Sequence, residues 1–458
     1  MQVGFGRGVI TPKGGKTAIA GNIPPRLTDV VHDDVLAVAM VIASENTRTI
    51  WVSCDMCHPN NRLMEDVITE LKKVIPDFEE SQLVLNATHA TACAYVTDDE
   101  FLDIGLKDFS GDMMPLGEVR KQICEGVVHA VQKALSNMHD CTMEFSTADI
   151  LTGYCRRVVY NDLSAVMYGN PYREDFLRME YPDSSATKLL YFYTIDEHKL
   201  LGIFANVPCP SQADECSLHI TGDYWTVVRN RVNETFGKDV EVISACASAG
   251  ELSPHRVMYS VGGYTDDIEN GPEAAERLGN FIAESIIKEK ERPLKKYSAE
   301  ELKHKRIIKV LDFPVRKPCE KDINNAIEYF KDKENFDQTG KPKGWVKHVK
   351  YSLIKYLADE KPEFYSAKVC VMRIANVLFF TAPMEVFTEY SKRISMKFPH
   401  NPIIDVQLTY DYMGYLPTKE AVEHGGYSTD IFSTVTDCEG GEFYVKEIFT
   451  LLSDISNS

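Results

Sequence analysis

The stretch LVLNATHATACAY, residues 83–95, contains the histidine with the clearest chemical potential in this sequence. A run of apolar and β-branched residues ends at Thr88 and His89, which predicts a buried strand with a histidine at its end. In layered α/β folds, ligands and metals collect at strand ends, and imidazole is a common metal ligand. The alternative is a core histidine whose ring bonds to a backbone carbonyl, and this stretch alone leaves both interpretations open.

Five further apolar runs also end in polar residues. These residues are Asp55; Cys209 with Ser211, Gln212 and Glu215; Glu251 with Ser253 and His255; Glu385; and Tyr415. Sparse polar residues at the ends of apolar strands indicate one shared cleft. Single members of the set have structural explanations, because Asp55 could cap a helix and Ser253, which precedes a proline, could start a turn.

The types of these residues suit a metal. A histidine, a thiolate or carboxylate, and a phenolate are ligands that zinc accepts in tetrahedral geometry, with one position open to water when the metal is catalytic. Zinc lowers the pKa of that water and polarises a carbonyl group. The spacing is long-range and matches no compact zinc motif. Cys54 and Cys57 form a lone CxxC, which we interpret as packing because no second pair accompanies it.

Composition excludes several classes of partner. The chain has 458 residues and a formal net charge of −18, which argues against binding to a phosphate backbone. The 12 cysteines show no repeated spacing, so we expect reduced thiols and a cytoplasmic protein. The first residues lack a signal-peptide core, and no window approaches 18 apolar residues, so we expect no membrane span. We expect a small-molecule substrate, and the sequence does not indicate an oligomeric state.

Alternating strand and helix patterns predict an α/β fold of layered mixed β-sheets flanked by helices, in a single large catalytic domain. Strands are predicted at 35–43, 49–55, 83–89, 188–196, 200–208, 240–250, 368–383 and 402–417, and helices at 63–75, 118–137, 224–237, 272–291 and 440–455. A Lys- and Glu-rich segment at 291–350 predicts a helical insertion or lid. The expected division is therefore 1–290, 291–350 and 351–458.

Several of these stretches, in this order, resemble the catalytic domain of the neutral/alkaline non-lysosomal ceramidases. The matching pieces are GFGRGVITP, VSCD, NATHATA, HITGDYW followed by SAGELSPHR, APMEVF, GYLPT and GGYS. The resemblance covers most of the chain apart from about 290–350. Members of that family are zinc amidases that cleave the N-acyl bond of ceramide, so the resemblance implies a zinc-dependent hydrolase of an amide-type bond.

The resemblance assigns four residues to a zinc site. His89 falls on the first histidine of the family's T-H-x-H motif, while Glu385 and Tyr415 fall on its glutamate and tyrosine ligands. Cys209 falls on the histidine of the family's V-H-x-T segment and could bind zinc as a thiolate. The second histidine of T-H-x-H is Thr91 here. The predicted set of His89, Cys209, Glu385 and Tyr415 therefore departs from that of the family.

The resemblance also implies residues that act on the substrate. They are Tyr427, Ser253, and Arg156 or Arg157. His255 and Glu215 lie outside the family pattern and are new nearby candidates, either of which could restore nitrogen or oxygen coordination of the metal. Tyr427 and the arginine would stabilise the developing oxyanion, and His255 or Glu215 would carry a proton. For Ser253, positioning or capping is favoured over a role as nucleophile.

The departures from the family pattern favour a smaller and more soluble substrate than ceramide, in a cytoplasmic branch of the family. Two alternatives remain open. Cys209 could be the nucleophile of a thiol mechanism, with His89 or His255 as its base. The chain could also be a non-catalytic homologue that binds a ligand without hydrolysing it.

Overall fold

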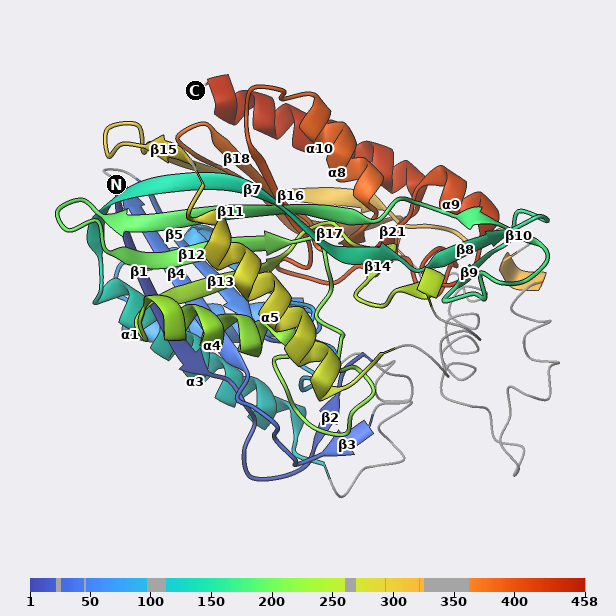
Figure 1. Ribbon diagram of the computed structural model, residues 1–458, viewed down its shortest axis with the longest axis horizontal. Helices are drawn as coiled ribbons and strands as arrows, with labels where there is room; N and C mark the ends of the chain where they lie inside the picture. The colour runs from blue at the N-terminus through green and yellow to red at the C-terminus, as the bar shows by residue number, and fades with distance from the viewer. Residues whose placement is uncertain are drawn as a thin grey trace.

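The computed structural model describes residues 1–21, 26–44, 47–96, 113–259, 269–292, 294–320, 322–324 and 362–457. Two β-sheets face one another, and helices cover the outer face of each sheet, so that the layers run helix, sheet, sheet, helix (Figure 1). This arrangement confirms the predicted fold class of layered mixed sheets flanked by helices. Among the described residues, no helix is both long enough and apolar enough to cross a membrane.

In the described chain, the larger sheet contains ten strands. Its order is β13-β12-β11-β7-β1-β4-β5-β6, and β14 and β15 also pair with β7. The strands are β1 (Gln2–Val9), β4 (Leu36–Ser44), β5 (Thr47–Cys54), β6 (Leu83–Ala87), β7 (His139–Cys155), β11 (Ser184–Thr194), β12 (Leu200–Val207), β13 (Glu241–Cys246), β14 (Leu252–Ser253) and β15 (Lys295–Tyr297). The interior of β4 is buried on both faces, which explains its near-continuous apolar sequence.

The outer face of the larger sheet carries α1 (Asn61–Val74), α3 (Leu116–Leu135), α4 (Tyr224–Phe236) and α5 (Pro272–Glu289). Glycines at alternate positions of β1 let α3 approach closely. A Cβ atom on Gly8 would lie 2.0 Å from the carbonyl oxygen of Gly126 in α3, and Gly4 and Gly6 meet the same helix. The GFGRG motif therefore specifies a contact between helix and sheet.

A second sheet of four strands, as far as the chain is described, has the order β16-β17-β18-β20. It comprises β16 (His304–Pro314), β17 (Phe364–Ile374), β18 (Val377–Thr381) and β20 (Ile403–Val406), and α8 (Thr388–Met396) and α10 (Cys438–Asn457) cover it. The two sheets meet through aromatic rings, since the rings of Trp51 and Phe204 in the larger sheet lie 6.0 and 5.6 Å from that of Phe379 in the second sheet. One continuous core thus joins segments from both halves of the chain.

Short elements complete the fold. They are β2 (Thr17–Ile19), β3 (Arg26–Thr28), β8 (Arg157–Tyr160), β9 (Ala165–Met167), β10 (Phe176–Met179), β19 (Glu385–Val386), β21 (Tyr415–Leu416), α9 (Lys419–His424) and the 3₁₀ turns Glu80–Gln82 and Val257–Tyr259. β19 and β21 pair in parallel and place Glu385 opposite Tyr415.

The segment expected to be a helical insertion begins differently. Residues 304–314 form β16, which pairs with β17 along its whole length. The helical expectation is wrong here because β16 is an edge strand, and Lys305, Arg306 and Lys309 interrupt its apolar pattern. Residues 325–361 lie outside the described residues, and with them most of the expected lid. The division at 290 and 350 stays a prediction.

Asp55 follows β5 and forms a buried ion pair. Both terminal nitrogens of Arg229 in α4 donate to its carboxylate, at 2.7 and 2.6 Å, and the backbone N–H of Leu36 donates at 2.9 Å. Both charged side chains are almost completely buried. The sequence left open whether Asp55 is a site residue or a helix cap. In the structure it connects β4, β5 and α4.

We expect Asp55→Asn to lower the free energy of unfolding by about 3–5 kcal/mol, because it leaves the Arg229 guanidinium buried without a counter-charge. Urea denaturation followed by circular dichroism measures the change. Glu70→Gln, at an exposed ion pair with Lys73, is the matched control and should leave the midpoint unchanged. Equal effects of the two substitutions would contradict a structural role for Asp55.

Asp223, in the GDYW motif, caps the start of α4. Its carboxylate accepts hydrogen bonds from the backbone N–H groups of Tyr224 and Asp214, both at 2.7 Å. Burial raises the pKa of Asp223 to about 7. The unfolded chain releases this proton near pH 4, so the proton-linked contribution to stability is complete below about pH 4 and is lost as the pH rises to about 7.

The variant Asp223→Asn should remove this dependence. The free energy of unfolding of the variant minus that of the parent should increase by a few kcal/mol between pH 4.5 and pH 7.5, since each unit of pKa difference contributes about 1.4 kcal/mol. Asparagine tolerates the positive φ of 55° at this position. Urea denaturation of both proteins at both pH values provides the test. A difference between the proteins that does not change with pH would refute the assignment.

Candidate active site

His89 follows β6 and adopts a left-handed backbone conformation, with φ of 63°. Its Nδ1 lies 2.9 Å from the carbonyl oxygen of Cys57, and because a carbonyl only accepts, Nδ1 carries the proton. Its Nε2 lies 3.1 Å from Oε2 of Glu385. A non-glycine residue in this conformation is uncommon and marks a position that the surroundings enforce.

Glu385 occupies the first position of β19, opposite Tyr415 of β21. One carboxylate oxygen faces His89, and the other accepts a hydrogen bond from the hydroxyl of Tyr412 at 3.0 Å. Both His89 and Glu385 are buried. The structure thus brings together residues that lie 296 positions apart in the sequence, as the resemblance predicts for the two ligands.

The two groups hold opposite charges. Burial acts to lower the pKa of His89, but the charge of Glu385 outweighs it and holds that pKa well above its usual value. Burial acts to raise the pKa of Glu385, but the charge of His89 and the hydrogen bond to it bring the pKa below its usual value. Both directions describe an imidazolium–carboxylate pair.

Arg156 places a second positive charge near Glu385. Its Nη2 donates to the hydroxyl of Tyr415 at 3.1 Å and to the carbonyl oxygen of Gly250 at 3.0 Å. The rings of Tyr415 and Tyr427 meet edge to face at 5.5 Å, and burial raises the pKa of Tyr427 to about 12. Both phenols therefore keep their protons near neutral pH and are available as donors.

Arg157, the other candidate arginine, has a structural role. It pairs with Glu180 and donates to the backbone carbonyls of Tyr427 and Gly425, at 2.6 and 2.7 Å. Of the two arginines, Arg156 is therefore the one whose charge acts on Glu385.

Ser253 and His255 lie on the other side of Arg156. The hydroxyl of Ser253 accepts a hydrogen bond from the backbone N–H of His255 at 2.9 Å, which is the turn geometry considered for this serine. Nε2 of His255 lies 3.4 Å from Oε1 of Glu215. The ring of Tyr168 contacts that of His255 edge to face at 6.0 Å, and the Tyr168 hydroxyl also interacts with Ser253 and Arg156.

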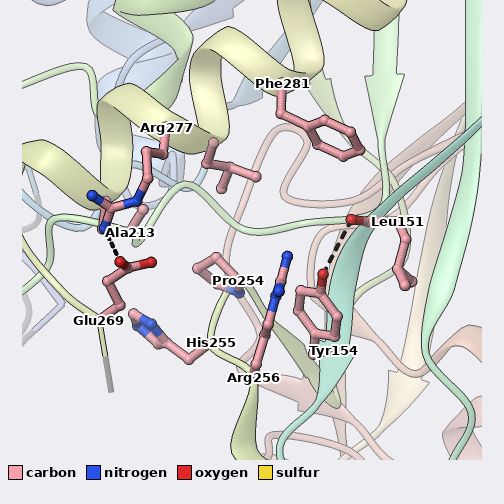
Figure 2. A pocket seen from close by; sticks show the side chains of 11 residues that line it. Leu151, Tyr154, Ala213, Pro254, His255, Arg256, Glu269, Arg277 and Phe281 are labelled. Atoms are coloured by element: carbon pink, nitrogen blue, oxygen red, sulfur yellow. Dashed lines mark hydrogen bonds and ion pairs between the residues drawn. The ribbon is translucent and has the colours of Figure 1, made fainter. Parts of the chain in front are cut away.

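A cavity of about 520 Å³ opens beside this network. His255 lines the cavity, as Figure 2 shows, and also contacts Glu215 and Tyr168 of the network. The volume suits a small organic ligand. A substrate bound in the cavity would therefore meet the polar network at His255.

Cys209 lies elsewhere. It follows β12 and packs in an apolar cluster with Tyr224 and Trp225, and burial raises the pKa of its thiol well above the usual value. Across the described residues, no three His, Cys, Asp or Glu side chains gather closely enough to hold a metal ion. Of the four predicted ligands, the structure brings together His89, Glu385 and Tyr415, and it does not add Cys209 to them.

The donors that are present do not fit the zinc site that the resemblance implies. The 3.1 Å between Nε2 of His89 and Oε2 of Glu385 is close to the edge of a zinc tetrahedron, about 3.4 Å for usual bond lengths. The phenol oxygen of Tyr415, however, accepts a hydrogen bond from a guanidinium. The second histidine of the family's T-H-x-H motif is Thr91 here. Its buried hydroxyl, which has no hydrogen-bond partner among the described residues, is a poor zinc ligand.

Two residues of the network, Tyr168 and Tyr412, escaped prediction. Gln212, already named among the strand-end residues, donates a hydrogen bond to the Tyr168 hydroxyl at 3.0 Å. Tyr412 lies three positions before Tyr415, so the TYDYMGY stretch held a usable signal. Tyr168 lies just after the short strand β9, where no pattern distinguishes it from a turn tyrosine.

Two comparisons with known proteins gave matches. Residues 1–223 match the family described as neutral/alkaline non-lysosomal ceramidase, N-terminal. The crystal structure of neutral ceramidase from Pseudomonas aeruginosa superposes with a TM-score of 0.72 at 14% identity, covering 100% of this chain and 74% of that one. A second structure, described as ceramidase complexed with C2, gives 0.70 at 14% identity, covering 98% and 74%.

A search of curated protein sequences gave no match to this chain. The family match and the structural similarity cover the segments that carry the polar network, from His89 in the first half to Tyr427 near the end. Residues 1–223 thus match the neutral/alkaline non-lysosomal ceramidase family, and the full length of the chain has the neutral ceramidase fold.

Proposed function

We propose that this chain hydrolyses an amide-type bond of a small, soluble substrate, and that the network of His89, Glu385, Arg156 and Tyr427 is its catalytic site. The family match implies amide-bond hydrolysis. The observation that carries the proposal is the convergence of a buried imidazolium–carboxylate pair and a buried arginine. Buried ionised groups are costly unless they serve a purpose, and they concentrate at functional sites.

The roles follow from the geometry. As water attacks the substrate carbonyl, negative charge develops on the carbonyl oxygen, and the Arg156 guanidinium and the Tyr427 hydroxyl stabilise it. The Glu385 carboxylate accepts the proton of the attacking water. That proton is delivered to the leaving nitrogen as the C–N bond breaks, with His255, which lines the cavity and faces Glu215, as its carrier. A cytoplasmic location belongs to the same proposal, supported by free and mostly buried cysteines.

Substitutions in the network should lower turnover without unfolding the protein. Tyr427→Phe removes one hydroxyl, and we expect a loss of about 10–100-fold in kcat/KM on short N-acyl amines; for Arg156→Lys we expect about 10²–10³-fold, because the planar donor pair is lost. Cys209→Ala should remain within about threefold of the parent.

Thermal melting of each variant is the control for folding. Full activity of the Arg156→Lys variant would contradict the proposed catalytic site. Loss of turnover in a folded Cys209→Ala variant would instead favour the thiol mechanism. A folded parent that binds N-acyl compounds but hydrolyses none of them would favour the non-catalytic homologue.

Zinc is the cofactor that the resemblance proposes for this site, and the donor set determines how tightly it would be held. One imidazole and one carboxylate, with a phenol already bonded to Arg156, provide fewer strong donors than zinc sites require. We therefore expect well below one zinc per untagged chain after dialysis, and turnover that survives a chelator. One tightly held equivalent, with activity lost on chelation and restored by zinc, would contradict this argument.

A further inference from the structure

The cavity beside the catalytic network is lined by two kinds of side chain. Leu151, Ala274, Leu278 and Phe281 are apolar, and Arg256 and Arg277 carry guanidinium groups. Figure 2 shows Arg277 and Phe281 projecting from α5 and Arg256 lying beside Tyr154. Leu151 and Phe281 expose 43% and 48% of their surface. Large apolar side chains left uncovered in a concave site indicate a ligand that covers them.

Arg256 supplies a positive charge to this cavity. Its guanidinium carbon lies 5.2 Å from the centre of the Tyr154 ring, and the Tyr154 hydroxyl in turn donates to the carbonyl oxygen of Leu151 at 3.4 Å. Within the described chain, no carboxylate forms an ion pair with Arg256, whereas Arg277 is paired with Glu269. Among the residues that the structure describes, the partner of the Arg256 guanidinium is thus the Tyr154 side chain and not a carboxylate.

The position of this charge is informative. Arg256 follows His255 directly, and His255 connects the cavity to the network through Glu215 and Tyr168. A ligand whose amide group reaches His255 would have an anionic group one or two bonds from that amide beside Arg256. An apolar chain on the other side of the amide would lie along Leu278 and Phe281 of α5.

We propose that this cavity is a substrate subsite for anionic N-acyl compounds, in which a carboxylate next to the amide pairs with Arg256 and the acyl chain covers α5. The inference rests on the proposed function, because it names the substrate class of the same site. Its chemistry is that of an N-acyl amino acid. A guanidinium held against an aromatic ring is suited to a carboxylate because it donates two parallel hydrogen bonds.

Equilibrium binding separates this inference from turnover. Isothermal calorimetry of the full chain would compare N-octanoylglycine with N-octanoylethanolamine, which has the same chain and amide but no charge. We expect the parent to bind the anionic probe at least about tenfold more tightly, because only its carboxylate can form a charge-assisted hydrogen bond with Arg256. Arg256→Gln should abolish this preference and leave binding of the neutral probe unchanged.

Two further variants complete the design. Arg231→Gln removes the same charge from an exposed site on α4, where the arginine pairs with Glu234, and it should retain the parent's preference. Phe281→Ser should weaken the binding of both probes several-fold, because each probe loses apolar contact with α5. Arg256 and Phe281 are both exposed, so neither change removes core packing.

The outcomes distinguish the two proposals. Equal binding of both probes by the parent, or an unchanged preference in Arg256→Gln, would overturn the subsite. Selective binding without hydrolysis of either probe would support the subsite and count against the proposed hydrolase. Hydrolysis of the neutral probe alone would support the hydrolase and overturn the subsite.

Discussion

The buried ion pair between His89 and Glu385 is the constraint on which the rest of this site depends. Neither charge could be stable in an apolar interior without the other, because removal of one partner leaves an unpaired buried charge. The Cys57 carbonyl and the Tyr412 hydroxyl supply the remaining hydrogen bonds. The pair therefore fixes the end of β6 against β19, and the pairing of β19 with β21 then places Tyr415 beside Arg156. A polar network assembled from distant segments follows from this one contact.

Much of the fold could be read from the sequence, because buried strands and amphipathic helices leave strong periodic signals. The strands at β4, β5 and β6 and the helices α4 and α5 lie close to where their patterns place them. β16 could not be recognised, since an edge strand with a solvated face resembles a charged helix in composition. The long strand β7 was missed for a related reason: it pairs with several partners along its 17 residues, and polar residues interrupt its apolar pattern.

The sequence indicates site residues that follow apolar runs, but it does not indicate which way a side chain points. His89, Glu385 and Tyr415 could be named because each follows an apolar run and falls on a ligand position of the family pattern. Arg156 and Arg157 are neighbours whose side chains diverge, one toward Tyr415 and one toward Glu180, and no one-dimensional pattern distinguishes them. Cys209 shows the opposite error. Its place in the sequence suits a ligand, but its side chain packs in the apolar cluster with Tyr224 and Trp225.

The network combines features of catalytic centres: buried opposite charges, phenols that keep their protons, and an adjoining cavity of about 520 Å³. A crystal structure with bound N-octanoylglycine would test directly whether the network is a catalytic centre. The account predicts the amide carbonyl oxygen within about 3 Å of Arg156 or Tyr427, the distance at which such donors stabilise an oxyanion. An amide bound away from both residues, or His89 and Glu385 separated from one another in that structure, would contradict it.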